Sequence, residues 1–320
     1  MPPQGATSRA VKWVKQGLIY RPAGRFDWNQ SHAQLPIVDA TDEARWRIYF
    51  ATRGADNRSN ISYIEVEAGR PEHILYEHDR PLLSFGALGA FDESGLMPVC
   101  IVTHEGRKYL YYAGWSLKQT VPYQNAIGLA LSTDGGRTFE RYAPGPLFGL
   151  RPHEPYFTGT MHVLIEQERW RAWYQSCTKW EIIAERAEPF YHLKYAESDD
   201  GIDWTRAGVV AIDYKDEGEG GISAATVLKE DGLYRMWYSY RRAAAYREDR
   251  QNSYRIGYAE SADGLRWTRK DEAAGITISD EGWDSEMIAY PCVVRYGDKR
   301  YMFYNGNGFG RTGIGYAVSE

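Results

Sequence analysis

The chain has 320 residues, of which 14% are aromatic, and its formal net charge is −5. It contains no prominent run of lysine and arginine, so a nucleic-acid partner is not expected. No apolar stretch approaches the roughly 18 residues of a membrane span, and the N-terminus lacks the apolar core of a signal peptide. Three cysteines, an odd number, argue against a disulfide scaffold. We therefore expect a cytoplasmic protein with no membrane partner.

An aromatic pair recurs along the chain at nearly even intervals. The pairs are Tyr49-Phe50, Tyr111-Tyr112, Trp173-Tyr174, Trp237-Tyr238 and Phe303-Tyr304. Each pair lies in a strand-like run, and three are followed by similar second runs: IGLALSTDGGRTFER, LKYAESDDGIDWTR and IGYAESADGLRWTR. Five periods of roughly 64 residues use the whole chain, and a fixed period is typical of a repeat fold. We predict an all-β, five-bladed β-propeller with a four-stranded antiparallel sheet in each blade.

The N-terminal segment is expected to complete the last blade. Its sequence WVKQG, residues 13–17, resembles WTRAG, residues 204–208, which opens a predicted fourth strand. The predicted single domain spans residues 1–320, with blades at about 31–80, 91–148, 154–213, 219–280, and 284–320 completed by 13–20. Pairing the two ends of the chain would remove a free sheet edge. Because a closed ring needs no partner to cover its edges, the sequence leaves the oligomeric state open.

The innermost strand of each blade is expected in a short apolar run. The runs are LPIVDA, LMPVCIV, TMHVLI, AATVL and AYPCVV. Pro36, Pro98 and Pro291 fall inside three of them, and proline is largely confined to edge strands because it cannot donate a ladder hydrogen bond. An innermost propeller strand is such an edge, since one of its sides faces the central channel. Cys100 and Cys292 occupy matching positions in two runs and are interpreted as core residues.

Three turns resemble the Asp-box turns of sialidase-type propellers. In each of them Asp134, Asp200 or Asp263 is followed by glycine. This composition is typical of a tight turn in which the carboxylate accepts backbone N–H groups and glycine takes a positive φ. We interpret these turns as structural, on the outer rim of the face opposite the functional site.

Function is expected at the mouth where the entry to the first strand and the loop after the second strand of every blade open together. The candidates entering first strands are His32, Asp92, Glu93, Glu154, Asp284 and Glu286. The candidates leaving second strands are Arg53, Trp115, Lys179, Trp180, Arg241 and Asn305. Long loops at 116–125, 176–192 and 239–253 would form a wall around this mouth.

Acids and tryptophans at one mouth favour cleavage of a glycosidic bond. One carboxylic acid protonates the leaving oxygen, and a second carboxylate supports the oxocarbenium-like centre or activates water. We predict Glu154 as the acid, with Asp92 and Glu286 as its catalytic partners and Trp115 and Trp180 as platforms for sugar rings. The predicted substrate-binding residues are His32, Arg53, Glu93, Trp115, Lys179, Trp180, Arg241, Asp284 and Asn305. For each acid the alternative is a loop carboxylate that bonds a backbone N–H.

The five blades, runs such as YLYYAGW and IGYAESADGLRW, and the acids before inner strands resemble the furanosidase-type five-bladed propeller enzymes. These are glycoside hydrolase families 32, 43 and 68, and family 130, which contains mannoside phosphorylases. In families 43 and 32 the resemblance implies an Asp base or nucleophile from blade one, an Asp from blade two and a Glu acid from blade three. Asp92 and Glu154 match the last two. His32 stands where the blade-one carboxylate is expected, and Asp27 lies several residues upstream.

The positive charges at the mouth favour an alternative reaction. A phosphate or other anionic group would suit them, since arginine binds it in a bidentate manner and lysine as a point charge. The residues concerned are His32, Arg53, His153, Lys179, Arg241 and Arg242. Phosphorolysis or glycosyl transfer needs one acid and an anion site but no blade-one base, with inorganic phosphate as a co-substrate of phosphorolysis.

A non-catalytic interpretation is also open. A sugar-binding propeller would keep Trp115 and Trp180 and tolerate the loss of Glu154, whereas a scaffold would present flat apolar faces. The ligand in every sugar-active case is a small molecule or an oligosaccharide. No cofactor and no metal site are predicted, because the histidines lie in different blades without ligand spacing, although an ion in the channel stays open.

Overall fold

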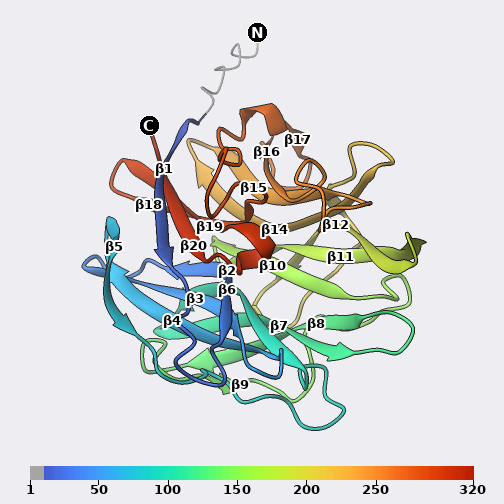
Figure 1. Cartoon of the computed structure of the whole chain (residues 1–320), viewed down its shortest axis with the longest axis horizontal. Coiled ribbons are helices and arrows are strands. Elements are labelled where there is room, and N and C mark those ends of the chain that lie inside the picture. Colours follow the sequence, from blue (N-terminus) through green and yellow to red (C-terminus); the bar gives the residue numbers. More distant parts are fainter. Residues whose placement is uncertain (1–10) are drawn as a thin grey trace.

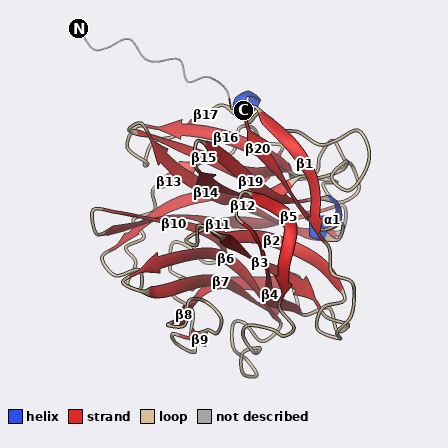
Figure 2. Ribbon diagram, turned by 90° about the vertical axis from the view of Figure 1, so that its left-hand side faces the viewer, coloured by secondary structure: helices blue, strands red, loops and turns tan. Residues whose placement is uncertain are grey.

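The computed structural model describes residues 11–320, and their regular structure is almost entirely β-strand (Figure 2). The exceptions are a single 3-10 turn, Asp271–Ala273, and the four-residue segment α1 (Asn307–Gly310). The all-β prediction is confirmed. Among the described residues, no helix is long and apolar enough to cross a membrane.

The antiparallel pairings divide the strands into five sets of four. Set 1 holds β2 (Ser31–Asp39), β3 (Arg45–Arg53), β4 (Ser59–Glu67) and β5 (Arg70–Glu77). Set 2 holds β6 (Gly95–His104), β7 (Arg107–Leu117), β8 (Tyr123–Ser132) and β9 (Glu140–Arg141). Set 3 holds β10 (Thr158–Glu166), β11 (Arg169–Ile183), β12 (Arg186–Ser198) and β13 (Val210–Ile212).

Set 4 holds β14 (Glu219–Glu230), β15 (Leu233–Arg242), β16 (Arg255–Ser261) and β17 (Thr268–Arg269). Set 5 holds β18 (Ala289–Tyr296), β19 (Lys299–Asn305), β20 (Ile314–Ser319) and β1 (Trp13–Tyr20). Single parallel bridges join set 1 to set 2 and set 3 to set 4, which makes two of the hydrogen-bonded sheets mixed.

The first strand of each set is called here the inner strand. Four of them, β2, β6, β10 and β14, lie around the middle of the molecule in Figure 1. The fifth, β18, contacts β14 and β2. Each inner strand contacts the inner strand of the next set, and β18 contacts β2, so the contacts run in a cycle. Pro36, Pro98 and Pro291 lie in β2, β6 and β18, as expected for strands with one side open to a channel.

The N-terminal strand β1 pairs with β20, side by side with the C-terminus (Figure 1). The register runs from Trp13 opposite Ser319 to Tyr20 opposite Ile314. Trp13 is buried and meets the ring of Trp237 edge-on at a centroid distance of 5.8 Å. The predicted pairing of the two ends of the chain is therefore observed, and it also ties set 5 to set 4.

Hydrogen bonds between inner strands connect the sets along the channel. The thiols of Cys100 and Cys292 accept the backbone N–H groups of Val163 and Val38, each at 3.3 Å. Both cysteines are buried, and burial raises the pKa of each thiol to about 12. The two residues at matching sequence positions are thus core groups, as predicted, and each serves as an acceptor for the next set.

The three Asp-Gly turns also connect neighbouring sets. Glycine carbonyls of these turns accept hydrogen bonds from aromatic side chains of the preceding set, at 3.2 Å, 2.7 Å and 2.9 Å. The donor and acceptor pairs are Tyr49 with Gly136, Tyr111 with Gly201, and Trp173 with Gly264. Within each turn the aspartate accepts backbone N–H groups, which supports the structural interpretation.

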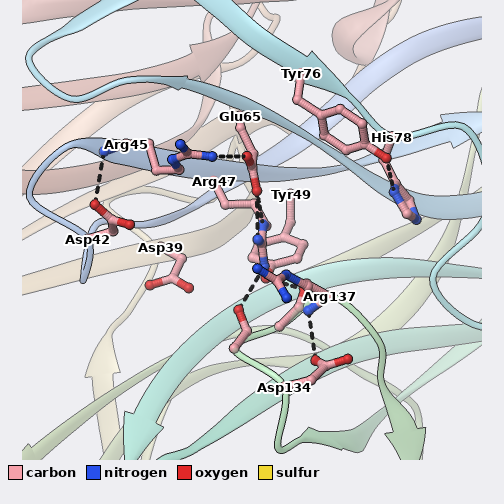
Figure 3. A network of polar contacts seen from close by, with 12 residues as sticks. Asp39, Asp42, Arg45, Arg47, Tyr49, Glu65, Tyr76, His78, Asp134 and Arg137 are labelled. Atoms are coloured by element: carbon pink, nitrogen blue, oxygen red, sulfur yellow. Dashed lines mark hydrogen bonds and ion pairs between the residues drawn. The ribbon is translucent and has the colours of Figure 1, made fainter.

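Figure 3 shows the first of these connections. Arg47 on β3 binds Glu65 on β4, with a distance of 2.7 Å between Nη2 and Oε1, and donates to the carbonyl of Gly135 at 2.8 Å. Asp134 in the same turn accepts the backbone N–H of Arg137 at 2.9 Å. The second strand of set 1 is therefore fixed to the outer turn of set 2 by polar as well as apolar contacts.

Candidate functional site

A cavity of about 370 Å³ lies where the first halves of the five inner strands meet. Every inner strand contributes to its lining, through Gln34, Met97, Thr160, Ser223 and Tyr290. A second, smaller cavity of about 80 Å³ is also lined by all five inner strands and shares Leu35, Thr160 and Tyr290 with the central cavity. The central cavity is the larger of the two.

Irregular backbone aims side chains into the central cavity. The register of every inner strand shifts close to the cavity, as it does at a β-bulge. At Leu35, Ala224 and Tyr290 the shift is accompanied by φ values of +55°, +51° and +59°. Such left-handed conformations are unfavourable for residues with a Cβ and concentrate at functional sites. The ring of Tyr290 reaches the lining through this conformation.

Several polar atoms of the lining are buried and have no protein partner. Gln34 is 7% exposed and Ser223 is 2% exposed. Gln34 Oε1, Ser223 Oγ and the Nε of Arg53 make no hydrogen bond within the described structure. Burying such an atom without a partner costs about 1–3 kcal/mol. Residues that carry two unsatisfied acceptors and one unsatisfied donor therefore line the central cavity.

Aromatic rings and amides complete the central cavity. The rings belong to Trp115, Tyr123, Tyr191, Tyr246, Tyr254, Tyr290 and Phe309, and the further amides to Asn57, Asn125 and Gln175. The rings of Tyr254 and Tyr290 lie 5.8 Å apart between centroids. The indole Nε1 of Trp115 donates to Ser59 Oγ at 2.7 Å, which fixes the plane of this ring. Aromatic faces beside amides and hydroxyls suit a sugar, whose rings have both apolar faces and hydroxyl groups.

A buried guanidinium supports the tyrosines of this wall. Arg241 is 1% exposed, donates to Tyr191 Oη at 3.0 Å and stacks over the Tyr246 ring at 3.8 Å. Tyr191 in turn hydrogen-bonds Tyr254. Burial alone would lower the pKa of Arg241, but the neighbouring tyrosines hold it well above its ordinary value. Burial raises the pKa of Tyr191 well above its ordinary value, so the Tyr191 side chain presents a neutral hydroxyl group.

None of the described residues that line the central cavity carries a carboxylate. The predicted acids lie outside it, in contacts that repeat from set to set. The Oδ2 atom of Asp92 accepts the Tyr112 hydroxyl at 3.2 Å and forms an ion pair with Arg141 at 2.8 Å. Asp284 accepts the Tyr304 hydroxyl at 3.0 Å and pairs with Lys15 at 2.7 Å. We call each such group an acid–tyrosine–cation clamp.

Glu154 forms the clamp of set 3. Its Oε1 atom accepts the hydroxyls of Tyr174 and Ser176, each at 2.9 Å, and its Oε2 atom pairs with Arg206 at 3.2 Å. The Nζ atom of Lys194 lies 3.3 Å from Oε1 of Glu154. Burial favours protonation, but these hydrogen bonds and charges together hold the Glu154 pKa below its ordinary value. Its carboxylate is therefore ionised and fully engaged, unlike a general acid that must hold a proton at neutral pH.

Each clamp joins three parts of one set. The acid precedes the inner strand, the tyrosine is the second aromatic of the repeated pair on the second strand, and the cation comes from the fourth-strand region. Set 4 uses a variant in which Glu219 binds Arg269, with 2.7 Å between Oε2 and Nη1, and Tyr238 hydrogen-bonds Asp271. The pattern of acids before inner strands is thus accounted for by a repeated structural contact. The catalytic roles of Glu154, Asp92 and Glu286 stay predictions.

Of the predicted site residues, Arg53 and Trp115 line the central cavity. His32 lies beside Arg53 at the start of β2, where its Nδ1 atom is 2.8 Å from Ser31 Oγ. Arg241 lies directly behind the lining. Asn305 is fully buried and accepts the backbone N–H of Leu35 at 3.2 Å, so it connects β19 to β2.

The remaining predicted residues lie away from the lining. Glu93 and Glu286 are in loops, where Glu93 accepts the backbone N–H of Gly89 at 2.6 Å and Glu286 is exposed. Lys179 and Trp180 lie on β11. Lys179 pairs with Glu181 at 2.5 Å, and Trp180 packs against Tyr123, with 5.5 Å between ring centroids.

The predicted loop lengths are wrong in two of three cases. The segment predicted as a loop at 176–192 is a hairpin of two long strands, because β11 continues to Ile183 and β12 begins at Arg186. The loop predicted at 116–125 is shortened, since β7 ends at Leu117 and β8 begins at Tyr123. Only the loop between β15 and β16 is long.

Sequence reasoning missed most of the lining, notably Gln34, Ser223 and Tyr290. A usable signal was present in the inner-strand runs. Leu35, Met97 and Tyr290 each precede a proline, and all three line the central cavity. The residue before a proline in an inner strand is therefore the position that faces the ligand space.

No group of three or more His, Cys, Asp or Glu side chains is placed to hold a metal ion in residues 11–320. His32 lies on β2 and His153 precedes β10, whereas His162 and His192 lie on β10 and β12 of the same set, so the expectation that the histidines lie in different blades is wrong for these two. His162 lies below the central cavity, where its Nε2 atom is 3.1 Å from the carbonyl of Val227.

Comparison with known proteins gives two kinds of match. No model of a known protein family matches the sequence. Two proteins of Mycobacterium tuberculosis, MT1551 from strain CDC 1551 / Oshkosh and Rv1502 from strain ATCC 25618 / H37Rv, are each 37% identical over 311 residues. The alignment covers 97% of this chain and 100% of each of them, and both are described as uncharacterized.

Solved structures share the fold at low identity. One glycoside hydrolase has a TM-score of 0.73 at 18% identity, covering 97% of this protein and 92% of that one. A member of the GH130 family of mannoside phosphorylases, described with glycoside hydrolases that target β-1,2 mannosidic linkages in Candida mannan, has a TM-score of 0.72 at 14% identity and covers 98% and 95%. A thermostable family-43 glycoside hydrolase has a TM-score of 0.61 at 18% identity, and the match covers 90% of this protein and 88% of that one. The resemblance to furanosidase-type propeller enzymes is confirmed at the level of fold.

Proposed function

The chain belongs to the family of the mycobacterial proteins MT1551 and Rv1502, and from this premise we propose that it acts on carbohydrates, binding a glycoside in its central cavity. In this proposal the five strand sets are the blades of a five-bladed β-propeller, and β1 closes the last blade. The glycosidases and mannoside phosphorylases that share the fold support a glycoside as the ligand class.

One observation carries the proposal. Gln34, Ser223 and Arg53, each with an unsatisfied polar atom, line a pocket whose walls are aromatic. Sugar hydroxyls can donate to Gln34 Oε1 and Ser223 Oγ and accept from Arg53, while the C–H faces of the ring pack on Trp115 or Tyr290. Specificity at such sites comes from a few placed polar groups in a largely apolar pocket.

Recognition of the sugar, and not hydrolysis by two carboxylates, is the function that this pocket supports best. Hydrolysis of that kind requires two carboxyl groups on either side of the bond, about 5–9.5 Å apart. The lining supplies none, and Glu154, Asp92 and Asp284 are held in clamps by tyrosine and a cation. Cleavage assisted by Glu154 would need this carboxylate to leave its four partners.

Calorimetric binding to a panel of mannosides, fructosides and arabinosides tests the proposal. At least one panel member is expected to bind, and Gln34→Ala and Ser223→Ala should each weaken it about tenfold, the equivalent of one hydrogen bond to a buried group. Gln16→Ala is the control, because Gln16 is exposed on β1. Absence of binding by every glycoside would overturn the proposal.

Product analysis of the same panel, with and without inorganic phosphate, separates binding from turnover. Release of free sugar that disappears in a correctly folded Glu154→Gln variant would restore hydrolysis with Glu154 as the acid. Sugar phosphate formed only with phosphate would establish phosphorolysis. The second candidate, transfer to or from an anionic group, is favoured by the two arginines, Arg53 and Arg247, in the lining.

A further inference from the structure

We infer that the sugar bound in the central cavity carries a negative charge, as a carboxylate or a phosphate, and that Arg53 binds this charge. The inference rests on the proposed function, since it specifies which class of sugar the cavity accepts. It follows from the distribution of charge around the lining, from the contacts of Arg53 and from the surroundings of that side chain.

The charged side chains that line the central cavity are both cationic. They are Arg53, at the end of β3, and Arg247, in the loop between β15 and β16. Arg247 is neutralised by Glu188, with which it forms an ion pair. In residues 11–320, no carboxylate lies within ion-pair distance of Arg53. The charge that a ligand meets inside the cavity is therefore the positive charge of Arg53.

The contacts of Arg53 differ from those of several other partly buried arginines. Its Nη1 atom donates to the side-chain and backbone oxygens of Asn57 at 3.2 Å and 3.4 Å, both neutral groups. Its Nε atom is buried without a partner. By contrast, Arg47, Arg141 and Arg206 each bind a carboxylate. A partly buried guanidinium with an unused donor is typical of a site that receives a carboxylate or phosphate in a bidentate manner.

A second arginine adds positive charge to this position. Arg311 lies close enough to Arg53 to act on it electrostatically, and it forms no ion pair within the described residues. Burial, opposed by Tyr290, and the charge of Arg311 lower the pKa of Arg53. Burial and the charges of both arginines lower the pKa of His32 to about 4, so this imidazole is neutral at neutral pH. A bound anion would relieve the repulsion between Arg53 and Arg311.

The neighbouring polar atoms orient the rest of the ligand. Gln34 lies on β2 next to β3, which carries Arg53, and its side chain hydrogen-bonds Tyr290. Its free Oε1 atom and the Oγ atom of Ser223 then accept ring hydroxyls. Neutral sugars would satisfy these two acceptors but leave Arg53 without a counter-charge. The structure thus distinguishes an anionic sugar from its neutral counterpart through one side chain.

Calorimetric titration with matched sugars tests the inference. Glucose, galactose and mannose are each compared with the corresponding uronic acid and the 6-phosphate, and inorganic phosphate alone is a further probe. We expect at least one anionic sugar to bind about tenfold or more tightly than its neutral counterpart, as a charge-assisted contact predicts. The uronic acids and phosphates form separate arms, so the preferred arm identifies the anionic group.

Variants of Arg53 test whether this side chain causes the preference for anionic over neutral sugars. Arg53→Gln should bring the anionic and neutral sugars to equal affinity, and Arg53→Lys should retain part of the preference. Arg266→Gln is the control, since the Arg266 side chain is 92% exposed and lies in an outer turn. The wild-type comparison between matched sugars stands even if a variant does not fold.

Two results would overturn the inference and are distinguishable from each other. If neutral sugars bind as tightly as anionic ones, or if folded Arg53→Gln keeps the preference, the cavity binds glycosides but Arg53 is not its anion site. If neither matched sugars nor the mannosides, fructosides and arabinosides bind, the proposed function fails as well.

Discussion

The clamps and the central cavity use polar residues in opposite ways. In the clamps every carboxylate is matched by a tyrosine hydroxyl and a cation, as in the contacts of Asp92, Glu154 and Asp284. In the central cavity, polar atoms of Gln34, Ser223 and Arg53 are left without partners. Satisfied groups hold the strands of one set together, whereas unsatisfied groups are available to a ligand. An acid at the right place in a repeat is therefore a poor indicator of catalysis until its partners are known.

The largest effect on the free energy of unfolding is expected from replacing the carboxylate of a clamp. Glu154→Gln should lower the free energy of unfolding by about 3 kcal/mol, because it leaves Arg206 and Lys194 near a neutral group. Urea unfolding measures this loss. Glu248→Gln, at an exposed ion pair with Arg186, should cost less than about 1 kcal/mol and serves as the control. If the Glu154→Gln variant is as stable as wild type but no longer cleaves a glycoside that wild type cleaves, Glu154 is catalytic. The contrast between structural clamps and a ligand-binding cavity then fails.

A smaller effect on the free energy of unfolding is expected from the protonation of His162, which lies below the central cavity. Burial lowers the pKa of His162 from 6.5 to about 4. The unfolded chain then binds more protons than the folded chain between these two values, so stability is lost as pH falls from 6.5 towards 4. His162→Gln should reduce the loss between pH 7.5 and pH 4.5 by on the order of 2 kcal/mol, measured by urea unfolding at both pH values. An unchanged loss would mean that His162 is protonated in the folded state.

The outer turns should show a still smaller effect, and no effect on ligand binding. Asp263→Ala removes an acceptor from the backbone N–H groups of Leu265 and Arg266, each at 2.8 Å. We expect a loss of about 1–2 kcal/mol in the free energy of unfolding. Sugar affinity should stay at the wild-type value. A change in the sugar affinity of Asp263→Ala would show that this outer turn is coupled to the central cavity.

The smallest effect on stability is expected inside the cavity. Ser223→Ala removes a buried hydroxyl without a protein partner, so the free energy of unfolding should not fall and should rise by up to about 1 kcal/mol. Thr226→Ala on the same strand is the matched control. Its hydroxyl donates to the carbonyl of Pro291 at 2.7 Å, so its loss should cost about 1 kcal/mol or more. Equal costs for the two variants would show that Ser223 has a partner in solution.

The repeat made the fold predictable, whereas the site depends on details that a repeat conceals. Aromatic pairs such as Trp173-Tyr174 recur because every set has the same packing problem, and WVKQG at the N-terminus resembles the start of a fourth strand for the same reason. Glu154 shares this regularity because its clamp is structural. Gln34 and Ser223 belong to no common motif, and bulges, which depend on tertiary packing, bring them together with Tyr290. Arg53 was recognisable by position, but its lack of a counter-charge appears only in three dimensions.

The pairing of β1 with β20 has a consequence for synthesis of the chain on the ribosome. Among the described strands, β1 (Trp13–Tyr20) emerges first, and its hydrogen-bonding partner β20 (Ile314–Ser319) emerges last. Until β20 has been made, set 5 is incomplete and the nascent chain exposes strand edges of the kind that aggregate. Set 5 is therefore expected to fold only after β20 has left the ribosome. A premature stop before Ile314 would remove β20 and leave β1 without its partner strand.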